Sequence, residues 1–293
     1  MVSAFDTTGS VSDALELVPM QPFGLLVVAR EHGHPIQSLP PAWFKERIRE
    51  HRLLLLRGFA PFPTPEGLSD YCATWGELML WPFGSVLELV EHPDPTDHIF
   101  DSSCVPYHWD GMYTKQLPAY QFFHCVNAID ASDGGRTIFC DGSRIWADAD
   151  PVLRERWKNI VVTYTIEKVA HYGGQVTAPL VCSHPVDGSP VLRFNEPPPM
   201  RIRFLNRPSL RFEGLSPDAV DAFVEEMRAL LYSQRYMYSH EWKTNDMVIA
   251  DNYVLLHGRT AFTSRAPRHI RRVHILGDPP KAGSDATRPA VVG

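Results

Sequence analysis

The sequence has no cysteine pair of the CxxC type and no long hydrophobic run. Its five cysteines are far apart in the chain, which argues against a disulfide framework and a structural zinc site and indicates a reducing compartment. The longest apolar runs, such as residues 53–56, are much too short to cross a bilayer. Because the N-terminal residues also lack the basic-then-apolar order of a signal peptide, the sequence predicts a cytoplasmic protein without a membrane span.

An excess of one charge is also absent. The net charge of −6 is modest, and basic residues cluster only near the C-terminus, so a nucleic-acid partner has no electrostatic support. The chain has 293 residues, 44% of them hydrophobic, which is enough for a sizeable core. No repeat or low-complexity linker divides it. We therefore expect one domain over residues 1–293 that acts on a small molecule.

Short β-branched and aromatic runs separated by turns predict a mainly β core. We expect strands at residues 23–29, 53–57, 85–90, 120–126, 137–140, 160–166, 247–250, 254–256 and 273–276. Three or four helices are expected, among them residues 42–51, one that begins at Thr64-Pro65, and a helical insertion around 216–232 with Ser216 as its N-cap. A mobile polar tail is expected after Asp278. The pattern predicts a β-sandwich or barrel decorated by helices.

Two His-x-Asp pairs occur in the chain, and about one is expected by chance in a sequence of this composition. The pair His92 and Asp94 lies in a proline-rich turn, where nothing directs the two side chains toward one point. The pair His108 and Asp110 is the better candidate. If these residues lie on an extended strand, they project to the same face and could approach one metal ion.

A third metal ligand must come from elsewhere, and His257 is the candidate. It follows the Asp251-Asn252 turn at the end of a predicted buried strand, from where it could face His108 and Asp110 across a barrel. Two histidines and one carboxylate on one side of an iron ion are typical of non-haem Fe(II) oxygenases. The alternative is a core histidine that is hydrogen-bonded to the backbone.

Four arginines follow His257 around the start of an apolar strand: Arg265, Arg268, Arg271 and Arg272. At least one of them should point inward, where a guanidinium needs an anionic partner and a planar carboxylate is the best geometric match. The alternative is a solvated surface turn. The distance of these arginines from His257 favours a functional site.

Together, these motifs resemble the taurine dioxygenase-like branch of the Fe(II)/2-oxoglutarate-dependent oxygenases. The resemblance covers most of the chain and rests on His108-x-Asp110, Gly134-Gly135-x-Thr137, Asp251-Asn252, and His257 followed by Arg268 and Arg272. It implies a double-stranded β-helix, or jelly roll. It also implies Fe(II) as the metal, with 2-oxoglutarate and dioxygen as cosubstrates.

Carried over by position, the resemblance assigns a role to six residues. It implies iron ligands at His108, Asp110 and His257. Thr137 and Arg268 would hold the distal carboxylate of 2-oxoglutarate, and Arg272 would face an anionic group of the primary substrate.

Two positions bear on the substrate. Trp81 and Cys104 stand where taurine enzymes carry polar contacts to the sulfonate, which favours a less polar, aromatic carboxylate. Asp110 is present, whereas related halogenases lack this carboxylate, so halogenation is not expected. Trp81 and Tyr113 are the residues that we expect in an aromatic pocket. Phe83 and Phe123 are further candidates that fit a core position equally well.

A closer resemblance exists within this branch. Residues 53–59, 79–84, 108–113 and 265–269 are similar to the oxygenases of isonitrile natural-product pathways. The similarity implies a tyrosine-derived isonitrile as substrate, with desaturation of its side chain or oxidative decarboxylation to a vinyl isonitrile. A hydroxylase of a small amino acid or carboxylate and a non-catalytic metal-binding jelly roll stay open, as does the oligomeric state. His171-Tyr172 could form a lid or a surface loop.

Overall fold

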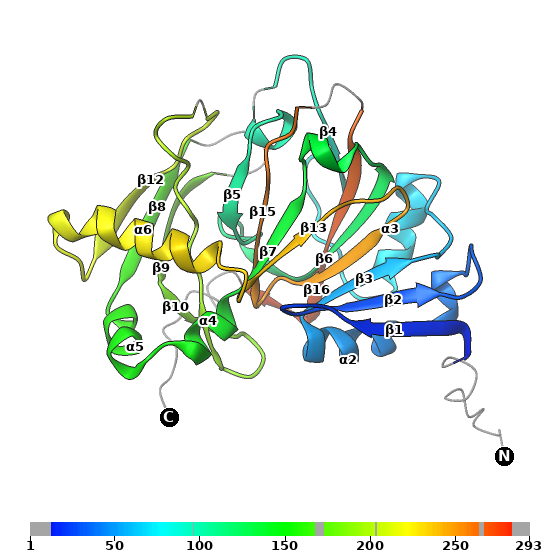
Figure 1. The fold of residues 1–293 in the computed structure, drawn as a ribbon, viewed down its shortest axis with the longest axis horizontal. Helices are drawn as coiled ribbons and strands as arrows, with labels where there is room; N and C mark the ends of the chain where they lie inside the picture. The colour runs from blue at the N-terminus through cyan, green and yellow to red at the C-terminus, as the bar shows by residue number, and fades with distance from the viewer. Residues whose placement is uncertain (1–12, 96, 168–172, 203, 264–266, 283–293) are drawn as a thin grey trace.

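The computed structural model describes residues 13–95, 97–167, 173–202, 204–263 and 267–282. A seven-stranded sheet forms the larger layer (Figure 1). In spatial order its strands are β1 (Leu15–Pro19), β2 (Leu25–Ala29), β3 (Leu53–Arg57), β14 (Met247–Asp251), β6 (Gln116–Asn127), β16 (His269–Ala282) and β4 (Val86–Val90). Only β2 and β3 pair in parallel; the other neighbours in this sheet are antiparallel.

A four-stranded antiparallel sheet faces it. Its order is β13 (Met237–His240), β7 (Thr137–Asp141), β15 (Leu255–Arg259) and β5 (Val105–His108). The side chains between the sheets form a buried cluster in which the Phe123 ring of β6 lies 6.2 Å from both the Phe139 ring of β7 and the Trp242 ring. The two sheets thus form the jelly roll that the resemblance implied, without closing into a barrel.

Helices cover the outer face of the larger sheet. α2 (Pro41–His51) buries Phe44 and Ile48, and α3 (Pro65–Ala73) buries Leu68 and Tyr71 against it. The Thr64 hydroxyl caps α3 by accepting a hydrogen bond from the backbone N–H of the third helical residue at 3.2 Å, so the predicted start of this helix at Thr64-Pro65 is confirmed. β3 is apolar at four consecutive positions because both of its faces are buried.

A second lobe lies to the left in Figure 1. It contains the sheet β12 (Ser209–Glu213), β8 (Val161–Ile166) and β9 (Gly174–Pro179), the hairpin β10 (Val181–Ser183) and β11 (Pro190–Leu192), and the helices α4 (Gly142–Asp148), α5 (Pro151–Lys158) and α6 (Val220–Leu231). α6 lies within the predicted insertion and buries Phe223, Met227 and Leu231, which packs this lobe onto a common core with Trp109. Four short 3-10 helices, η1 (Ile36–Ser38), η2 (His98–Phe100), η3 (Ala131–Asp133) and η4 (Pro217–Ala219), complete the described elements.

The structure corrects several expectations. The described residues contain five α-helices rather than three or four: α4 and α5 were missed, although Asp141 and Asp150 cap them with side-chain hydrogen bonds to backbone N–H groups. Ser216 makes no side-chain capping bond, because the chain enters α6 through η4. β16 continues to Ala282, where it pairs with β6, so the chain is still in the sheet after Asp278.

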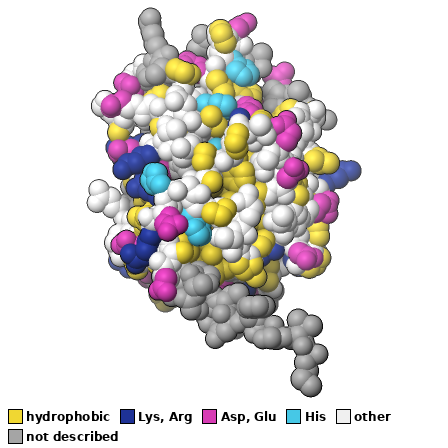
Figure 2. Space-filling model, turned by 90° about the vertical axis from the view of Figure 1, so that its right-hand side faces the viewer, with side chains coloured by type: hydrophobic (Ala, Val, Ile, Leu, Met, Phe, Trp, Pro, Cys, Tyr) yellow, Lys and Arg dark blue, Asp and Glu magenta, His cyan; other side chains and the backbone are white. Residues whose placement is uncertain are grey.

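The surface shows no field of a single sign on the face drawn in Figure 2. Acidic and basic side chains are interspersed there around a central band of hydrophobic side chains. No helix among the described residues is long and apolar enough to cross a membrane.

Candidate active site

Three potential metal ligands meet between the two main sheets. His108 ends β5 and lies opposite His257 of β15 in register, with the two ring centroids 4.2 Å apart. Asp110 completes the group, since its Oδ1 lies 3.8 Å from His108 Nε2 and its Oδ2 lies 3.5 Å from His257 Nε2. One ligand atom from each residue lies within 4.8 Å of the others, and this is the one such group of three found in the described part of the chain.

The position of Asp110 differs from the expectation. β5 ends at His108 and Asp110 lies in the following turn, so the prediction that one extended strand directs both side chains is wrong. Asn252, which is fully buried, holds the turn instead. Its Oδ1 accepts a hydrogen bond from the Asp110 N–H at 3.1 Å, and its Nδ2 donates to the carbonyls of Asp110 at 3.0 Å and Pro118 at 2.9 Å. The turn before β15 therefore helps to place Asp110 as well as His257.

The charges of the three side chains suit a divalent metal. His108 Nδ1 lies 2.9 Å from the Pro106 carbonyl, which can only accept, so Nδ1 donates and Nε2 keeps its lone pair. Burial lowers the pKa of His108 and, further, that of His257, so both imidazoles are neutral. Burial alone would raise the pKa of Asp110, but nearby cations such as Arg272 hold that pKa well below its usual range. Two neutral imidazoles and one carboxylate form a donor set that fits Fe(II).

Two residues beside Asp110 were not predicted from the sequence. His274 Nε2 lies 2.7 Å from Asp110 Oδ2, and the Gln121 amide donates to the same oxygen. Arg272 Nη1 forms an ion pair with that oxygen at 2.9 Å. A signal for His274 was present, because it follows Arg272 by two residues and so lies on the same face of β16.

A pocket beside the histidines contains the residues expected to bind a carboxylate. Thr137, Arg268, Arg272 and His257 all line it. Arg268 is 5% exposed, its Nε donates to the Gly135 carbonyl at 3.2 Å, and burial lowers its pKa to about 9. Among the described residues, no acidic side chain forms an ion pair with this guanidinium. A buried cation without a counter-charge is unfavourable, so the pocket favours binding of an anion.

A larger pocket of about 870 Å³, including its open mouth, lies on the other side of the metal group. Its lining includes Trp81 and Tyr113 together with Phe83, His108, Asp110 and Arg272. The Trp81 ring stacks on Phe83 with centroids 6.0 Å apart and lies 5.7 Å from the His274 ring. Burial raises the pKa of Tyr113. Phe123 belongs instead to the smaller pocket and to the core between the sheets.

Arg272 lines both pockets, whereas its neighbour Arg271 points away from them. Arg271 pairs with Glu88 at 3.2 Å and donates to the Phe62 carbonyl at 3.0 Å, so it supports the outer layer of the sheet. The expectation that at least one of the four arginines points inward is confirmed by Arg268 and Arg272. Arg265 lies outside the described residues.

The remaining sequence candidates lie apart from the site or outside the described residues. His92 stacks on Phe100 with ring centroids 4.4 Å apart, and no metal group contains it or Asp94 among the residues described. Cys104 is not among the residues that line either pocket. His171 and Tyr172, the candidate lid, lie outside the described residues.

Arg259, two residues after His257, anchors the loop between the two pockets. Its guanidinium donates to the backbone carbonyls of His98, Ile99, Asp101 and Ser103 at 3.2, 2.9, 2.6 and 2.7 Å. His98 and Ile99 line the larger pocket, and Ile99 also lines the smaller one. The strand that carries a potential metal ligand thus also fixes a wall shared by both pockets.

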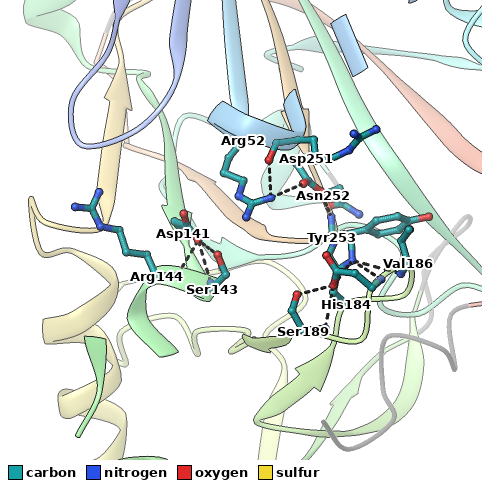
Figure 3. Close-up of polar contacts among 12 residues, drawn as sticks. Arg52, Asp141, Ser143, Arg144, His184, Val186, Ser189, Asp251, Asn252 and Tyr253 are labelled. Carbon is teal, nitrogen blue, oxygen red and sulfur yellow. Dashed lines mark hydrogen bonds and ion pairs between the residues drawn. The ribbon is translucent and has the colours of Figure 1, made fainter. Parts of the chain in front are cut away.

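A polar network supports the Asp251-Asn252 turn from behind (Figure 3). Asp251 accepts a hydrogen bond from the Tyr253 N–H at 2.9 Å, and its second oxygen lies 3.9 Å from Arg52 Nη1. Arg193 donates to the Asn252 carbonyl at 3.0 Å. Burial raises the pKa of Asp251 to about 6, because the Arg52 and Arg193 guanidinium groups and the Tyr253 N–H do not offset the loss of water.

Fold and site together define the class of protein, which is a jelly-roll non-haem Fe(II)/2-oxoglutarate-dependent dioxygenase. The family model described as "Taurine catabolism dioxygenase TauD, TfdA family" matches residues 22–274. The chain therefore belongs to the TauD/TfdA family.

Its relatives include enzymes named for isonitrile chemistry. The chain is 46% identical over 258 residues to the tyrosine isonitrile desaturase of Pseudomonas aeruginosa, covering 88% of each chain. It is 41% identical to the 3-((Z)-2-isocyanoethenyl)-1H-indole synthase of Fischerella ambigua, over 88% of this chain and 94% of that one. A solved structure of PvcB, described as an Fe, alpha-ketoglutarate dependent oxygenase from an isonitrile synthetic pathway, has a TM-score of 0.78 with 40% identity and covers 97% of each chain.

Proposed function

We propose that this protein is an Fe(II)/2-oxoglutarate-dependent oxygenase that converts the isonitrile derivative of tyrosine to an unsaturated product. The product is either the desaturated amino-acid isonitrile or, after loss of CO2, the vinyl isonitrile. The observation that carries the proposal is the position of Arg272, which lines an aromatic pocket directly beside the three metal ligands. The name of the relative at 46% identity supports a tyrosine isonitrile as substrate, and the name of the relative at 41% identity supports an unsaturated isonitrile as product.

In this proposal His108, Asp110 and His257 hold the iron. Thr137 and Arg268 bind the distal carboxylate of 2-oxoglutarate, since the buried Arg268 guanidinium supplies a paired set of donors for a planar carboxylate. The metal and the cosubstrate, when bound, supply the oxidising power: dioxygen oxidises 2-oxoglutarate to succinate and CO2 while the substrate loses two hydrogens, which leave in water.

The larger pocket orients the substrate in two ways. Arg272 binds its carboxylate and so keeps the adjacent side-chain carbons near the metal group. Trp81 and Tyr113 supply flat apolar surface for the aromatic ring. A phenol ring and the larger indole ring are both consistent with this lining, and the Fischerella relative is named for an indole product.

The proposal is tested by anaerobic mixing of protein, Fe(II) and 2-oxoglutarate, followed by substrate and air. We expect a weak visible absorption band before air is added, and then one succinate for each tyrosine isonitrile that loses two hydrogens. Product mass separates the outcomes: loss of two hydrogens is desaturation, further loss of CO2 is decarboxylation, and gain of one oxygen would support the alternative hydroxylase. Absence of the band with bound iron would support a non-catalytic metal-binding protein. Repeating the assay with tryptophan isonitrile shows which of the two isonitriles, phenol or indole, is the better substrate.

We also propose that the chain works as a single oxygenase domain in the cytoplasm. The family match extends over residues 22–274, and the five cysteines are free thiols, which suits a reducing compartment.

A further inference from the structure

The most strongly hydrogen-bonded atom of the metal group is Oδ2 of Asp110. His274 Nε2 lies 2.7 Å from it, Arg272 Nη1 lies 2.9 Å from it, and the Gln121 amide also donates to it. Each oxygen also lies near one histidine of the group: Oδ1 is 3.8 Å from His108 Nε2, and Oδ2 is 3.5 Å from His257 Nε2. A carboxylate oxygen that already accepts three donors can bind a metal only by giving up some of them, whereas Oδ1 is available.

His274 and Gln121 form a matched pair on two neighbouring strands. They lie directly opposite each other in the register of β16 and β6, and their side chains are 2% and 1% exposed. Burying two polar side chains side by side is costly unless both are hydrogen-bonded, and Asp110 is the partner that both share. Because both are carried by the centre of the larger sheet, their donor atoms are held by the fold itself.

His274 also contacts the substrate side of the site. Its ring lies 5.7 Å from the Trp81 ring, and its backbone carbonyl accepts a hydrogen bond from the Met79 N–H at 3.0 Å. The segment that carries Trp81 is therefore attached to the strand at the same residue that contacts Asp110. The position of Asp110 is set from three directions: by Asn252 at the backbone, and by Gln121 and His274 at the carboxylate.

We propose that His274 and Gln121 are positioning residues that fix the rotation of the Asp110 carboxylate, so that it offers Oδ1 as a single ligand atom to the metal. This inference rests on the proposed role of His108, Asp110 and His257 as the metal site, but not on the identity of the substrate. Partners of this kind around metal ligands typically change metal affinity 10-fold to 100-fold when removed.

The test uses the full chain and measures the affinity for Mn(II) alone, from the loss of the free-ion EPR signal on titration. His274→Leu and Gln121→Leu each remove a donor while filling similar space, and we expect Mn(II) affinity to fall by about 10-fold to 100-fold. His274→Gln keeps an N–H donor and should restore most of the affinity. The control is His124→Leu: this histidine lies on the same strand as Gln121, is equally buried and contacts Phe62 on the opposite side of the sheet.

Each result decides the matter. The inference would be overturned if His274→Leu bound Mn(II) as tightly as the wild type. It would also be overturned if His274→Gln and His274→Leu lost equal affinity, because an equal loss indicates that His274 serves only in packing. If His274→Leu does not fold, unchanged Mn(II) affinity in Gln121→Leu would overturn the inference. Failure of the wild-type protein to bind Mn(II) would contradict the proposed function, while normal metal binding without turnover of tyrosine isonitrile would contradict only the proposed substrate.

Discussion

The two pockets on either side of the metal group are built from different material. The smaller pocket takes its polar side chains from strands or from their ends: Thr137 begins β7, His257 and Arg259 lie on β15, and Arg268 directly precedes β16. The larger pocket takes Trp81, Tyr113 and much of its remaining wall from segments between strands. The residues expected to bind 2-oxoglutarate, which the whole family uses, are therefore fixed by the sheets. The residues expected to select the substrate lie on loops, whose sequences change more easily during evolution.

The largest effect is expected at the boundary between the pockets. His257→Ala leaves two of three metal ligands, so we expect succinate formation to fall at least about 1,000-fold, both with and without substrate. Succinate is measured by mass spectrometry under saturating Fe(II). Activity within tenfold of the wild type would contradict the assignment of His257 as a ligand.

On the strand-built side, Arg268→Met should raise the KM for 2-oxoglutarate about 100-fold and leave the KM for the isonitrile unchanged. The reason is the loss of two hydrogen bonds to a charged group, each contributing about 1.5 kcal/mol or more. Steady-state kinetics with each substrate varied in turn provides the measurement. Arg211→Met, at an exposed site on β12, is the matched control. Equal changes in both KM values would show that Arg268 does not distinguish the pockets.

The free energy of unfolding should depend on pH through Asp251, the last residue of β14, which directly precedes the turn to β15. The pKa of Asp251 is about 6 in the folded protein, against 3.8 for the ordinary group. Between these pH values the folded chain binds a proton that the unfolded chain does not, so lowering the pH from 7 to 4 stabilises the wild type relative to Asp251→Asn. A shift of two pKa units corresponds to about 3 kcal/mol.

Urea unfolding of both proteins at pH 7, 5.5 and 4 measures this difference, and the exposed-site variant Asp218→Asn corrects for general effects of removing a charge. A difference in unfolding free energy that stays constant across this range would contradict the raised pKa of Asp251.

The smallest effect is expected on the loop-built side. Trp81→Ala should raise the KM for the isonitrile about tenfold, which corresponds to about 1.4 kcal/mol of lost aromatic contact, and leave the KM for 2-oxoglutarate unchanged. The control is Leu80→Ala, which alters a neighbour that is 76% exposed and does not line the pocket. A change in the 2-oxoglutarate KM instead would mean that the loops also shape the smaller pocket.

The same division describes what the sequence could predict. Strand β3 has the predicted bounds, and the cluster of four arginines around the start of an apolar strand correctly indicated that at least one of them points inward. The reason given for Asp110 was wrong, since a turn clamped by Asn252, 142 residues away, sets its position. Gln121 was missed because its role depends on a cross-strand register with His274 that no local pattern reveals, whereas His274 was missed although it follows Arg272 by two residues on the same strand. Helices α4 and α5 were missed although their aspartate caps were visible in the sequence.

The anchor at Arg259 has a consequence for how such a site can diversify. Arg259 binds the 98–103 loop through four backbone oxygens, which every residue type possesses. The side chains of His98 and Ile99, which line the pocket wall, can therefore be exchanged without loss of these four bonds, whereas Asp101 also contributes its carboxylate, 3.7 Å from the Arg259 guanidinium. Homologous enzymes could acquire new substrates through side-chain changes in this shared wall. Its backbone would keep the same position, because Arg259, on the strand that carries His257, holds it.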